Sequence, residues 1–352
     1  MPTVLQAVLR AFTIVILSAF WSAFTAFNLF IEWWKHKDST GRSFFTARNH
    51  QTPPKCLTEG PWTHGFLQLT NIRMHYVEAG DKKNPLMVLV HGFPEFWYSY
   101  RFQLKYFRHK YRVVALDMRG YNDTDKPVGI RNYDAGSLAG DVAEAIEQLG
   151  GKAILVGHDL GGMVCWILAL LRPELIADRM IILNVPHHEA FQKRIQTTSS
   201  QFLKSWYMFM FQCPLLPEIS FSANDFAYLE NVFRKQPMGL VHQENFTDED
   251  LEAWKHVFSK PNAVTPPLNY YRALGMGAVG RRQQNASAEP VKVKPKTLII
   301  WGEKDTALDV EGAELSITLC RDARLVRIPD ASHWVQQDVP DRVNALIEEF
   351  IQ

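Results

Sequence analysis

The sequence has few cysteines and no excess of charge of either sign. Four of its 352 residues are cysteine and none forms a CxxC pair, which argues against a disulfide framework or a zinc site and fits free thiols in a reducing compartment. Because 38 basic side chains face 37 acidic ones, no basic surface for nucleic acid is present. The hydrophobic share of 47% excludes a disordered or collagen-like chain. The length suits one large domain, or one domain carrying an insertion.

Long hydrophobic runs are also scarce, and only one is present. Residues 11–31 read AFTIVILSAFWSAFTAFNLFI and contain no charged side chain. At about 1.5 Å per residue, such a helix can cross a hydrocarbon core of about 30 Å. Trp33 and Trp34 follow at the far end, where indoles favour the membrane interface. The run is too long for the apolar part of a cleaved signal peptide, typically about 7–15 residues. We therefore predict an uncleaved signal anchor that contacts membrane lipid.

The charges flanking this run predict its orientation. Only Arg10 precedes it, whereas basic side chains follow it at Lys35, Lys37, Arg42 and Arg48. The positive-inside rule then places the rest of the chain in the cytosol. We expect a single-pass protein of the endoplasmic reticulum membrane.

Beyond residue 62, short apolar runs alternate with helical patterns. The runs favour strands at residues 86–90, 112–116, 153–156, 180–184, 297–301 and 325–328. Apolar residues at helical spacing lie between several of them, at residues 137–149, 163–171 and 343–351. Near-continuous Val, Ile and Leu strands alternating with helices predict an α/β fold, with a mostly parallel central sheet and helices on both faces.

This alternation stops between residues 189 and 288. The stretch has no clear buried strand but is rich in aromatic residues at helical spacing, which predicts an inserted helical cap. The chain thus divides into a membrane anchor (1–34), a polar linker (35–62), the first part of the α/β core (63–188), the cap (189–288) and the second part of the core (289–352).

The strand at 153–156 runs into a glycine-rich turn that carries an aspartate. Asp159 lies between Gly157 and Gly161, the G-x-nucleophile-x-G form of a nucleophile elbow, with Asp where a serine hydrolase has Ser. The glycines leave room beside a sharp strand-to-helix turn. The spacing does not fit a dinucleotide-binding loop. An aspartate that only caps the following helix is the remaining alternative.

Other strand ends carry the rest of a hydrolytic site. Phe93 follows the strand at 86–90, and its N–H would join that of Leu160 as a donor to an oxyanion. Asp305 and His333 follow the last two strands. The order nucleophile, acid, histidine is that of α/β-hydrolases. Glu303 is the alternative acid.

From about residue 65 to its end, the chain resembles the epoxide hydrolase branch of the α/β-hydrolase superfamily. It is most similar to the membrane-anchored animal subgroup. The matching motifs are HGFPEFWYS at 91–99, DMRGY at 117–121, GHD at 157–159, WYMFMFQ at 206–212, PLNYYR at 267–272, WGEKD at 301–305 and HWVQQD at 333–338.

The resemblance implies an α/β-hydrolase fold that hydrolyses epoxides to vicinal diols. Asp159 would open the epoxide and form an ester, and His333, oriented by Asp305, would activate the water that hydrolyses it. Tyr271 and Tyr207 would donate hydrogen bonds to the epoxide oxygen, although Tyr207 also fits an aromatic stripe of the core. No metal or organic cofactor is needed.

The neighbours of Asp159 would contact the substrate as well. Phe93 and Leu160 would form the oxyanion hole and, together with Trp97, bind the substrate. The membrane anchor and a cap rich in Phe, Trp and Met favour a lipophilic small molecule, such as the epoxide of an unsaturated fatty acid.

Two other functions fit parts of the same pattern. The family usually has Trp after the nucleophile, and this chain has Leu160. A dehalogenase could use the same aspartate, but the missing indole weakens that interpretation. A membrane-tethered homologue that binds a lipid or a partner without turnover is the second alternative. The pair His187-His188 fits a turn better than a metal site, because no third ligand is apparent.

Overall fold

The computed structural model describes residues 4–275 and 291–352. Eight strands form one sheet in the order β1-β2-β4-β3-β5-β6-β7-β8. Strand β2 pairs antiparallel with both β1 and β4, and the remaining pairs are parallel. The strands are β1 Thr63–Gln68, β2 Arg73–Ala79, β3 Leu86–Val90, β4 Arg112–Leu116, β5 Ala153–His158, β6 Ile176–Leu183, β7 Lys296–Gly302 and β8 Ala323–Ile328.

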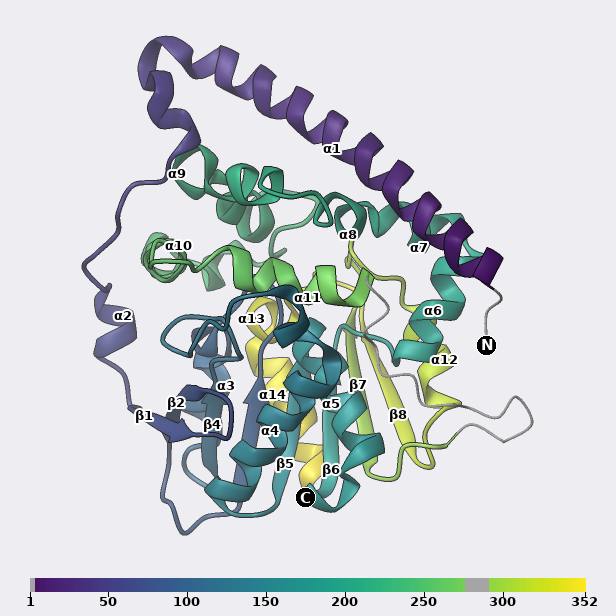
Figure 1. Cartoon of the computed structure of the whole chain (residues 1–352). Helices are drawn as coiled ribbons and strands as arrows, with labels where there is room; N and C mark the ends of the chain where they lie inside the picture. The colour runs from purple at the N-terminus through teal and green to yellow at the C-terminus, as the bar shows by residue number, and fades with distance from the viewer. Residues whose placement is uncertain (1–3, 276–290) are drawn as a thin grey trace.

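Helices cover both faces of this sheet, which confirms the predicted fold class. Helices α4 and α5 pack on one face, and α3 and α14 on the other (Figure 1). Every residue of β3 and β5 is buried, as expected for central parallel strands. The core helices are α3 Arg101–Phe107, α4 Ala135–Leu149, α5 Asp159–Leu171, α12 Glu311–Ile317, α13 Val335–Asp338 and α14 Pro340–Ile351, with short 3₁₀ helices η2 Trp97–Tyr100, η3 Ile130–Tyr133 and η4 Pro173–Leu175.

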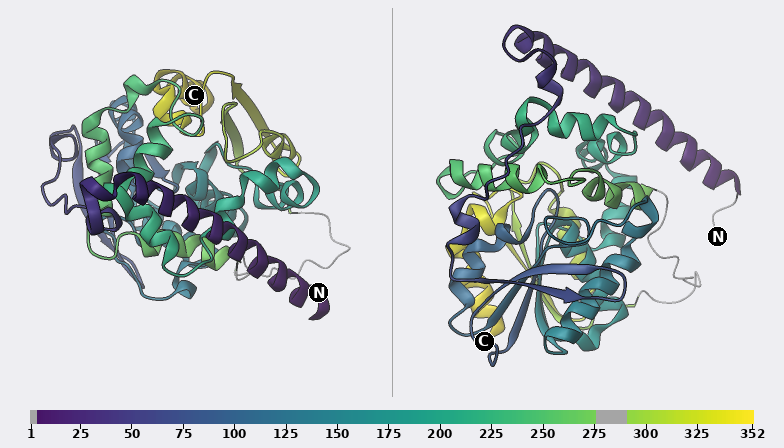
Figure 2. Two further views of the ribbon diagram at one scale, coloured as in Figure 1. Left: turned by 90° about the horizontal axis from the view of Figure 1, so that it is seen from above. Right: turned by 60° about the vertical axis from the view of Figure 1, so that its left-hand side comes forward.

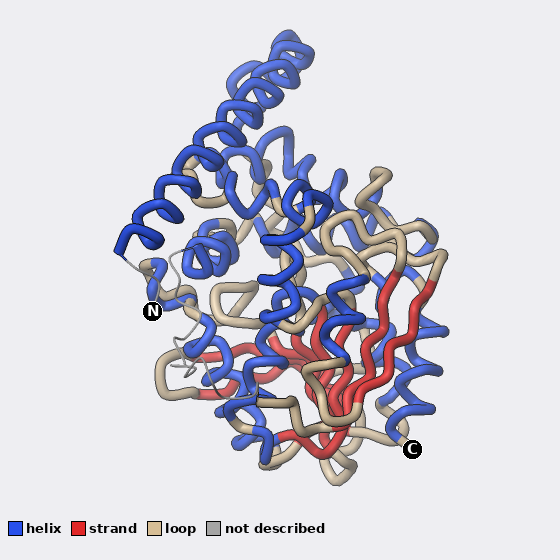
Figure 3. The backbone as a smooth tube through the Cα atoms, turned by 90° about the vertical axis from the view of Figure 1, so that its right-hand side faces the viewer, coloured by secondary structure: helices blue, strands red, loops and turns tan. Residues whose placement is uncertain are grey.

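The cap lies over the ends of the strands, and the tube view shows it between the sheet and the N-terminal helix (Figure 3). Within the described residues of the predicted cap, every regular element is helical. Residues 276–288 of that segment lie outside the described residues. The cap elements are α6 His188–Thr197, α7 Ser199–Lys204, α8 Trp206–Met210, α9 Leu216–Arg234, η5 Gln243–Asn245, α10 Asp248–Phe258 and α11 Thr265–Gly275.

Helix α9 is interrupted near its middle. Ala223 is extended, and Asn224, Asp225 and Phe226 have positive φ angles of 48°, 55° and 60°. Asn and Asp tolerate this left-handed conformation, but a phenylalanine rarely adopts it. The break separates the face of α9 that carries Phe221 from the second half of the helix.

The N-terminal helix α1, Val4–Thr40, crosses the outer side of the cap (Figures 1 and 2). Its segment Ala11–Asp38 contains an 18-residue stretch with a mean hydropathy of 2.0 and is long and apolar enough to cross a membrane. Trp21 packs against Trp206 of α8, with ring centroids 5.5 Å apart. Large apolar side chains on the other faces of α1 are exposed, at Phe12, Val15, Ile16, Phe20, Phe24, Phe27 and Phe30.

The helix continues past residue 34, the predicted end of the anchor. Residues 35–40 are polar and remain helical, and Lys35 forms an ion pair with Glu32 one turn earlier. The 3₁₀ helix η1, Gly41–Phe45, and the short helix α2, Lys55–Thr58, follow. Phe44 and Leu57 are buried, so the segment predicted as a polar linker packs against the folded domain.

Candidate active site

The turn between β5 and α5 holds Asp159 at the start of the helix. Its φ of 46° lies in the left-handed region. The flanking positions have no room for a side chain larger than that of glycine. A Cβ on Gly161 would lie 2.2 Å from the carbonyl oxygen of Val90. One on Gly157 would lie 2.5 Å from Sγ of Cys165. Close packing of the turn against β3 and α5 therefore holds the aspartate in a conformation that few residues adopt.

A backbone N–H fixes the carboxylate of Asp159. The N–H of Phe93 donates to Oδ2 at 3.0 Å. Leu160 lies in the first turn of α5, where a backbone N–H has no partner within its helix. Of the two predicted oxyanion donors, the N–H of Phe93 adjoins the carboxylate of Asp159, and Leu160 is the next residue in the chain.

The side chain of His333, which lies near the C-terminal end of the sequence, faces the same carboxylate. Its Nε2 lies 3.8 Å from Oδ1 of Asp159, and its Nδ1 forms a hydrogen bond of 2.7 Å with Oδ2 of Asp305. The alternative acid, Glu303, instead pairs with Arg327 at the surface. The structure thus brings together Asp159, His333 and Asp305.

Asp305 is itself fixed by neighbouring donors. The side chain of Asn184 donates to Oδ2 at 2.8 Å, and the N–H groups of Ala307 and Leu308 donate to Oδ1. Sequence reasoning missed Asn184, which follows β6 and has no motif of its own. With Oδ1 and Oδ2 both occupied, the carboxylate can hold the imidazole in one orientation.

The buried charges determine the protonation of His333. Burial alone would lower the pKa of its imidazole, but the carboxylates of Asp305 and Asp159 outweigh burial and raise that pKa to about 9. Burial would raise the pKa of Asp305, and the charge and hydrogen bond of His333 lower it instead. Near neutral pH the free site therefore holds an imidazolium between two carboxylates.

Two tyrosines of the cap cover the site. The rings of Tyr207 and Tyr271 lie 5.7 Å apart at 86°, and Tyr271 also packs on the ring of Phe93 at 5.3 Å. Burial, and then the charge of Asp159, raise the pKa of both phenols well above the usual value. Within the described residues, neither hydroxyl group makes a hydrogen bond. Both tyrosines are therefore protonated and able to donate.

A third tyrosine was missed by the sequence reasoning. Tyr228 of α9 packs against Phe93 and Phe221, and the charge of Asp159 adds to the effect of burial in raising its pKa. Its ring reaches the site because α9 is broken just before it. No motif in the sequence indicates such a break.

Trp97 does not join this group. Its indole is buried against Trp62 and His64, on the side of β1, and its backbone N–H donates to Asp117. We therefore assign Trp97 a packing role in place of the predicted contact with substrate. The chain turns after Glu95, so the two ends of the HGFPEFWYS motif face different parts of the fold.

Two buried side chains, His158 and Glu95, hold the backbone of His333 in place. Nε2 of His158 lies 2.9 Å from the carbonyl oxygen of His333, and its Nδ1 lies 2.6 Å from Oε2 of Glu95. Burial would raise the pKa of Glu95, but the contact with His158 lowers it. Glu95 and His158 thereby fix the loop that carries the imidazole of His333.

Comparisons with known proteins agree with this arrangement. The family model of the alpha/beta hydrolase fold matches residues 85–340. The chain is 49% identical over 316 residues to epoxide hydrolase 2 of Caenorhabditis elegans, covering 88% of this chain and 85% of that protein. It is 42% identical over 315 residues to human epoxide hydrolase 4, covering 87% of this chain and 83% of the relative. The chain belongs to the epoxide hydrolase family.

A solved epoxide hydrolase shares the architecture. The crystal structure of the Bacillus megaterium epoxide hydrolase in complex with an inhibitor superimposes with a TM-score of 0.72 at 29% identity. The match covers 82% of this chain and 99% of that one. The part it leaves uncovered is of the size of the N-terminal helix and the segment after it.

No candidate metal centre occurs in the described part of this epoxide hydrolase. His187 and His188 pack ring against ring, and burial lowers the pKa of both. No cluster of three or more potential ligands occurs among residues 4–275 and 291–352.

The raised pKa of His333 predicts a dependence of stability on pH. Folding favours the imidazolium, whose unfolded pKa is about 6.5. Its contribution of about 3 kcal/mol is fully present below pH 6.5 and is lost as the pH rises through about 9. We expect the difference in unfolding free energy between the wild type and His333→Gln to shrink over this range, measured by denaturant unfolding in detergent. A difference that stays constant from pH 6.5 to 9 would contradict the assignment.

Proposed function

We propose that this epoxide hydrolase converts lipophilic epoxides to vicinal diols through a covalent ester on Asp159. The observation that carries the proposal is the position of the Asp159 carboxylate. One oxygen lies 3.8 Å from Nε2 of His333, the other accepts from the N–H of Phe93, and the charge of the carboxylate contributes to raising the pKa of the phenols of Tyr207 and Tyr271. This supports a nucleophile at Asp159, a base at His333 and two acids at the tyrosines.

Ring opening is the first step. An oxygen of the Asp159 carboxylate attacks a ring carbon, the carbon–oxygen bond of the epoxide breaks, and the electron pair passes to the epoxide oxygen. Tyr207 or Tyr271 donates its proton to this developing alkoxide while the other phenol holds it by a hydrogen bond. A carboxylate is ionised at neutral pH, so it needs no base for this displacement.

Hydrolysis of the ester is the second step. The charge of Asp159 disappears when the ester forms, which removes one of the causes that raise the pKa of His333. The imidazole then loses its proton more readily and can take one from a water molecule that attacks the ester carbonyl. The proton that His333 loses before the attack passes to the tyrosinate left by ring opening, and the N–H groups of Phe93 and Leu160 stabilise the oxyanion that the water forms. When the oxyanion collapses, the bond between the ester carbonyl carbon and the alkoxide oxygen breaks. The departing oxygen takes the second proton of the water and becomes a hydroxyl of the diol, which leaves Asp159 as a carboxylate and His333 as an imidazolium.

The membrane helix favours a lipophilic substrate. Segment Ala11–Asp38 has the length and hydropathy of a membrane span, and the ring of Phe93 lies among Phe211, Phe221 and Tyr271 beneath the cap. We infer that α1 crosses the endoplasmic reticulum membrane and that the catalytic domain faces the cytosol. Protease protection in intact microsomes tests this orientation, since cleavage of the domain from the outside is expected.

Isotope labelling tests the ester. In a single turnover in oxygen-18 water with a fatty-acid epoxide, the oxygen added to the diol is expected to come from Asp159, and the label is expected in the peptide that contains this residue. The mechanism requires that Asp159→Ala gives no diol. Label taken directly from water into the first diol would exclude Asp159 as the nucleophile.

The two phenols are expected to share the ring-opening step. Each of Tyr207→Phe and Tyr271→Phe should slow ester formation about 10- to 100-fold, and the double variant about 1,000-fold or more, in rapid-quench measurements. Tyr270→Phe is the matched control, because its hydroxyl donates to the carbonyl oxygen of Arg119 outside the site. Equal effects of Tyr270→Phe and Tyr271→Phe would contradict an acid role.

A further inference from the structure

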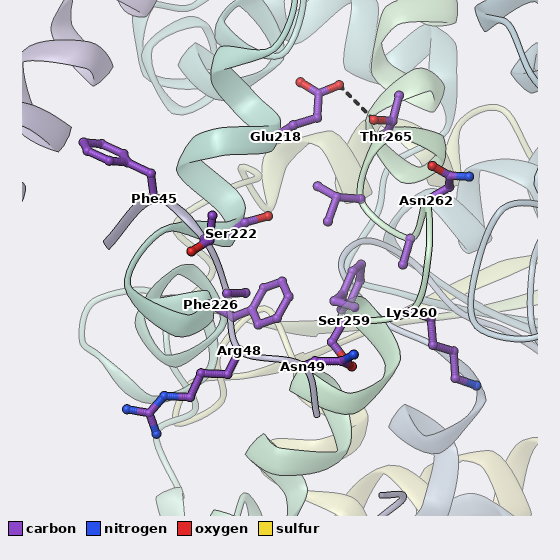
Figure 4. Close-up of a pocket in the computed structure, with 15 residues that line it drawn as sticks. Phe45, Arg48, Asn49, Glu218, Ser222, Phe226, Ser259, Lys260, Asn262 and Thr265 are labelled. Carbon is purple, nitrogen blue, oxygen red and sulfur yellow. Dashed lines mark hydrogen bonds between the residues drawn. The ribbon is translucent and has the colours of Figure 1, made fainter. Parts of the chain in front are cut away.

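A cavity of about 490 Å³ opens in the cap beside the segment that follows α1 (Figure 4). Its walls come from residues 45–49, from the first half of α9 and from residues 258–265. Phe226, Phe258 and Val264 form an apolar part of its lining. The rest is polar or charged, including Ser222, Asn262, Thr265, Arg48, Glu218 and Lys260. Its volume lies within the range of about 300–1,000 Å³ typical of sites for small molecules.

The outer wall of this cavity adjoins the end of the membrane helix. Phe45 lines the cavity, and its ring stacks on Trp33 of α1 with centroids 6.2 Å apart. Trp33 in turn contacts Phe30 in the apolar segment. Indole rings concentrate at the boundary between lipid and water. With α1 in a membrane, the cavity therefore lies where the helix leaves the lipid.

The inner wall adjoins the active site. The rings of Phe226 and Phe258 contact Phe221, with centroids 6.2 Å and 4.8 Å away. Phe221 contacts Phe93, at 6.2 Å, whose N–H holds the nucleophile Asp159. One layer of aromatic rings therefore separates the cavity from the residues around the carboxylate.

The segment leaving the membrane also fixes the break in α9. The carboxylate of Asp225 accepts from the N–H of Arg48 and from Nζ of Lys255, and it lies 2.9 Å from Nε2 of His50. These contacts hold three consecutive left-handed residues beside Phe221, a conformation that needs support from its surroundings. The position of the anchor segment and that of the aromatic layer are thereby connected.

We propose that this cavity is an outer vestibule through which long-chain epoxides pass from the lipid to Asp159, with Phe221 as the barrier between them. The proposal rests on the epoxide hydrolysis proposed above and adds the route of the substrate. An alkyl chain fits the apolar part of the lining formed by Phe226, Phe258 and Val264, whereas a short, water-soluble epoxide gains nothing from contact with it. The vestibule should therefore discriminate substrates by chain length.

Filling the cavity tests the route. Ser222→Trp should lower kcat/KM about tenfold or more for a C18 epoxide in phospholipid vesicles, and change it less than about twofold for styrene oxide in water. Ile219→Trp is the control, because Ile219 lies on the same helix, is 40% exposed and does not line the cavity. An equal fall for both epoxides in Ser222→Trp, or no fall for the C18 epoxide, would overturn the proposal.

A binding experiment separates this proposal from the proposed chemistry. A C18 epoxide with a photoactivatable diazirine in its chain is cross-linked to Asp159→Asn, and the labelled peptides are identified by mass spectrometry. Label on residues 45–49 or 258–265, suppressed by adding Ser222→Trp, is expected whether or not the wild type turns the epoxide over. Label confined to other surfaces would overturn the vestibule. Failure of the wild type to form diol would count only against the proposed function.

Discussion

Replacing Asp159 by asparagine should abolish turnover, lowering kcat for any epoxide substrate by about 10⁴-fold or more. The amide is neutral and a poor nucleophile, so no ester can form at a useful rate. The shape of the side chain is retained, and the N–H of Phe93 can still donate to the amide oxygen in place of Oδ2. The loss would therefore be chemical. Diol formation at saturating epoxide is the measurement.

The control for this variant is its fold. Asp159→Asn should keep its unfolding temperature within a few degrees of the wild type, since the turn and its glycines are unchanged. Asp159→Ala should give the same loss of activity and rule out slow conversion of the asparagine back to aspartate. Activity within tenfold of the wild type in the alanine variant would show that another residue attacks the epoxide.

His333→Gln should separate the two steps and trap the ester. The nucleophile and both phenols remain, so one equivalent of epoxide should be consumed. Hydrolysis loses its base, and steady-state turnover should fall by about 10³- to 10⁵-fold. Intact-protein mass spectrometry would then show one adduct with the mass of the epoxide.

The double variant Asp159→Asn with His333→Gln serves as the matched control and should carry no adduct. If His333→Gln neither turns over nor acquires an adduct while remaining folded, the histidine would be required for ring opening. That result would contradict the two-step mechanism and favour a direct attack of water. A turnover close to that of the wild type would assign the base to another group.

The parts of this structure that follow from local pattern were predictable from the sequence. Strand β3 is a short, fully apolar run, and β4 and β5 are apolar apart from Arg112 and His158 at their ends. The elbow at Asp159 is marked by the glycines that its packing requires. Strands β1 and β2 were missed. Strand β1 lies at the edge of the sheet with most of its residues exposed, so it carries no continuous apolar run.

Features that depend on tertiary contacts were not predictable. Tyr228 reaches the site only because contacts to His50 and Lys255, far away in the sequence, stabilise the break in α9. Trp97 lies within the HGFPEFWYS motif, yet the chain turns and buries its indole against Trp62. Neither outcome is set by the spacing of residues within one element.

The contact between Trp21 and Trp206 has a mechanical consequence. It joins the membrane helix to the cap, whereas the C-terminus and the far end of the sheet lie at the opposite end of the molecule (Figure 1). Trp21 lies near the middle of the apolar run 11–31, so in a helix that spans a bilayer it would sit near the middle of the hydrocarbon core. A cap in water cannot reach that depth. The packed arrangement of α1 on α8 and a spanning arrangement of α1 therefore exclude each other, and insertion requires that the two indoles separate.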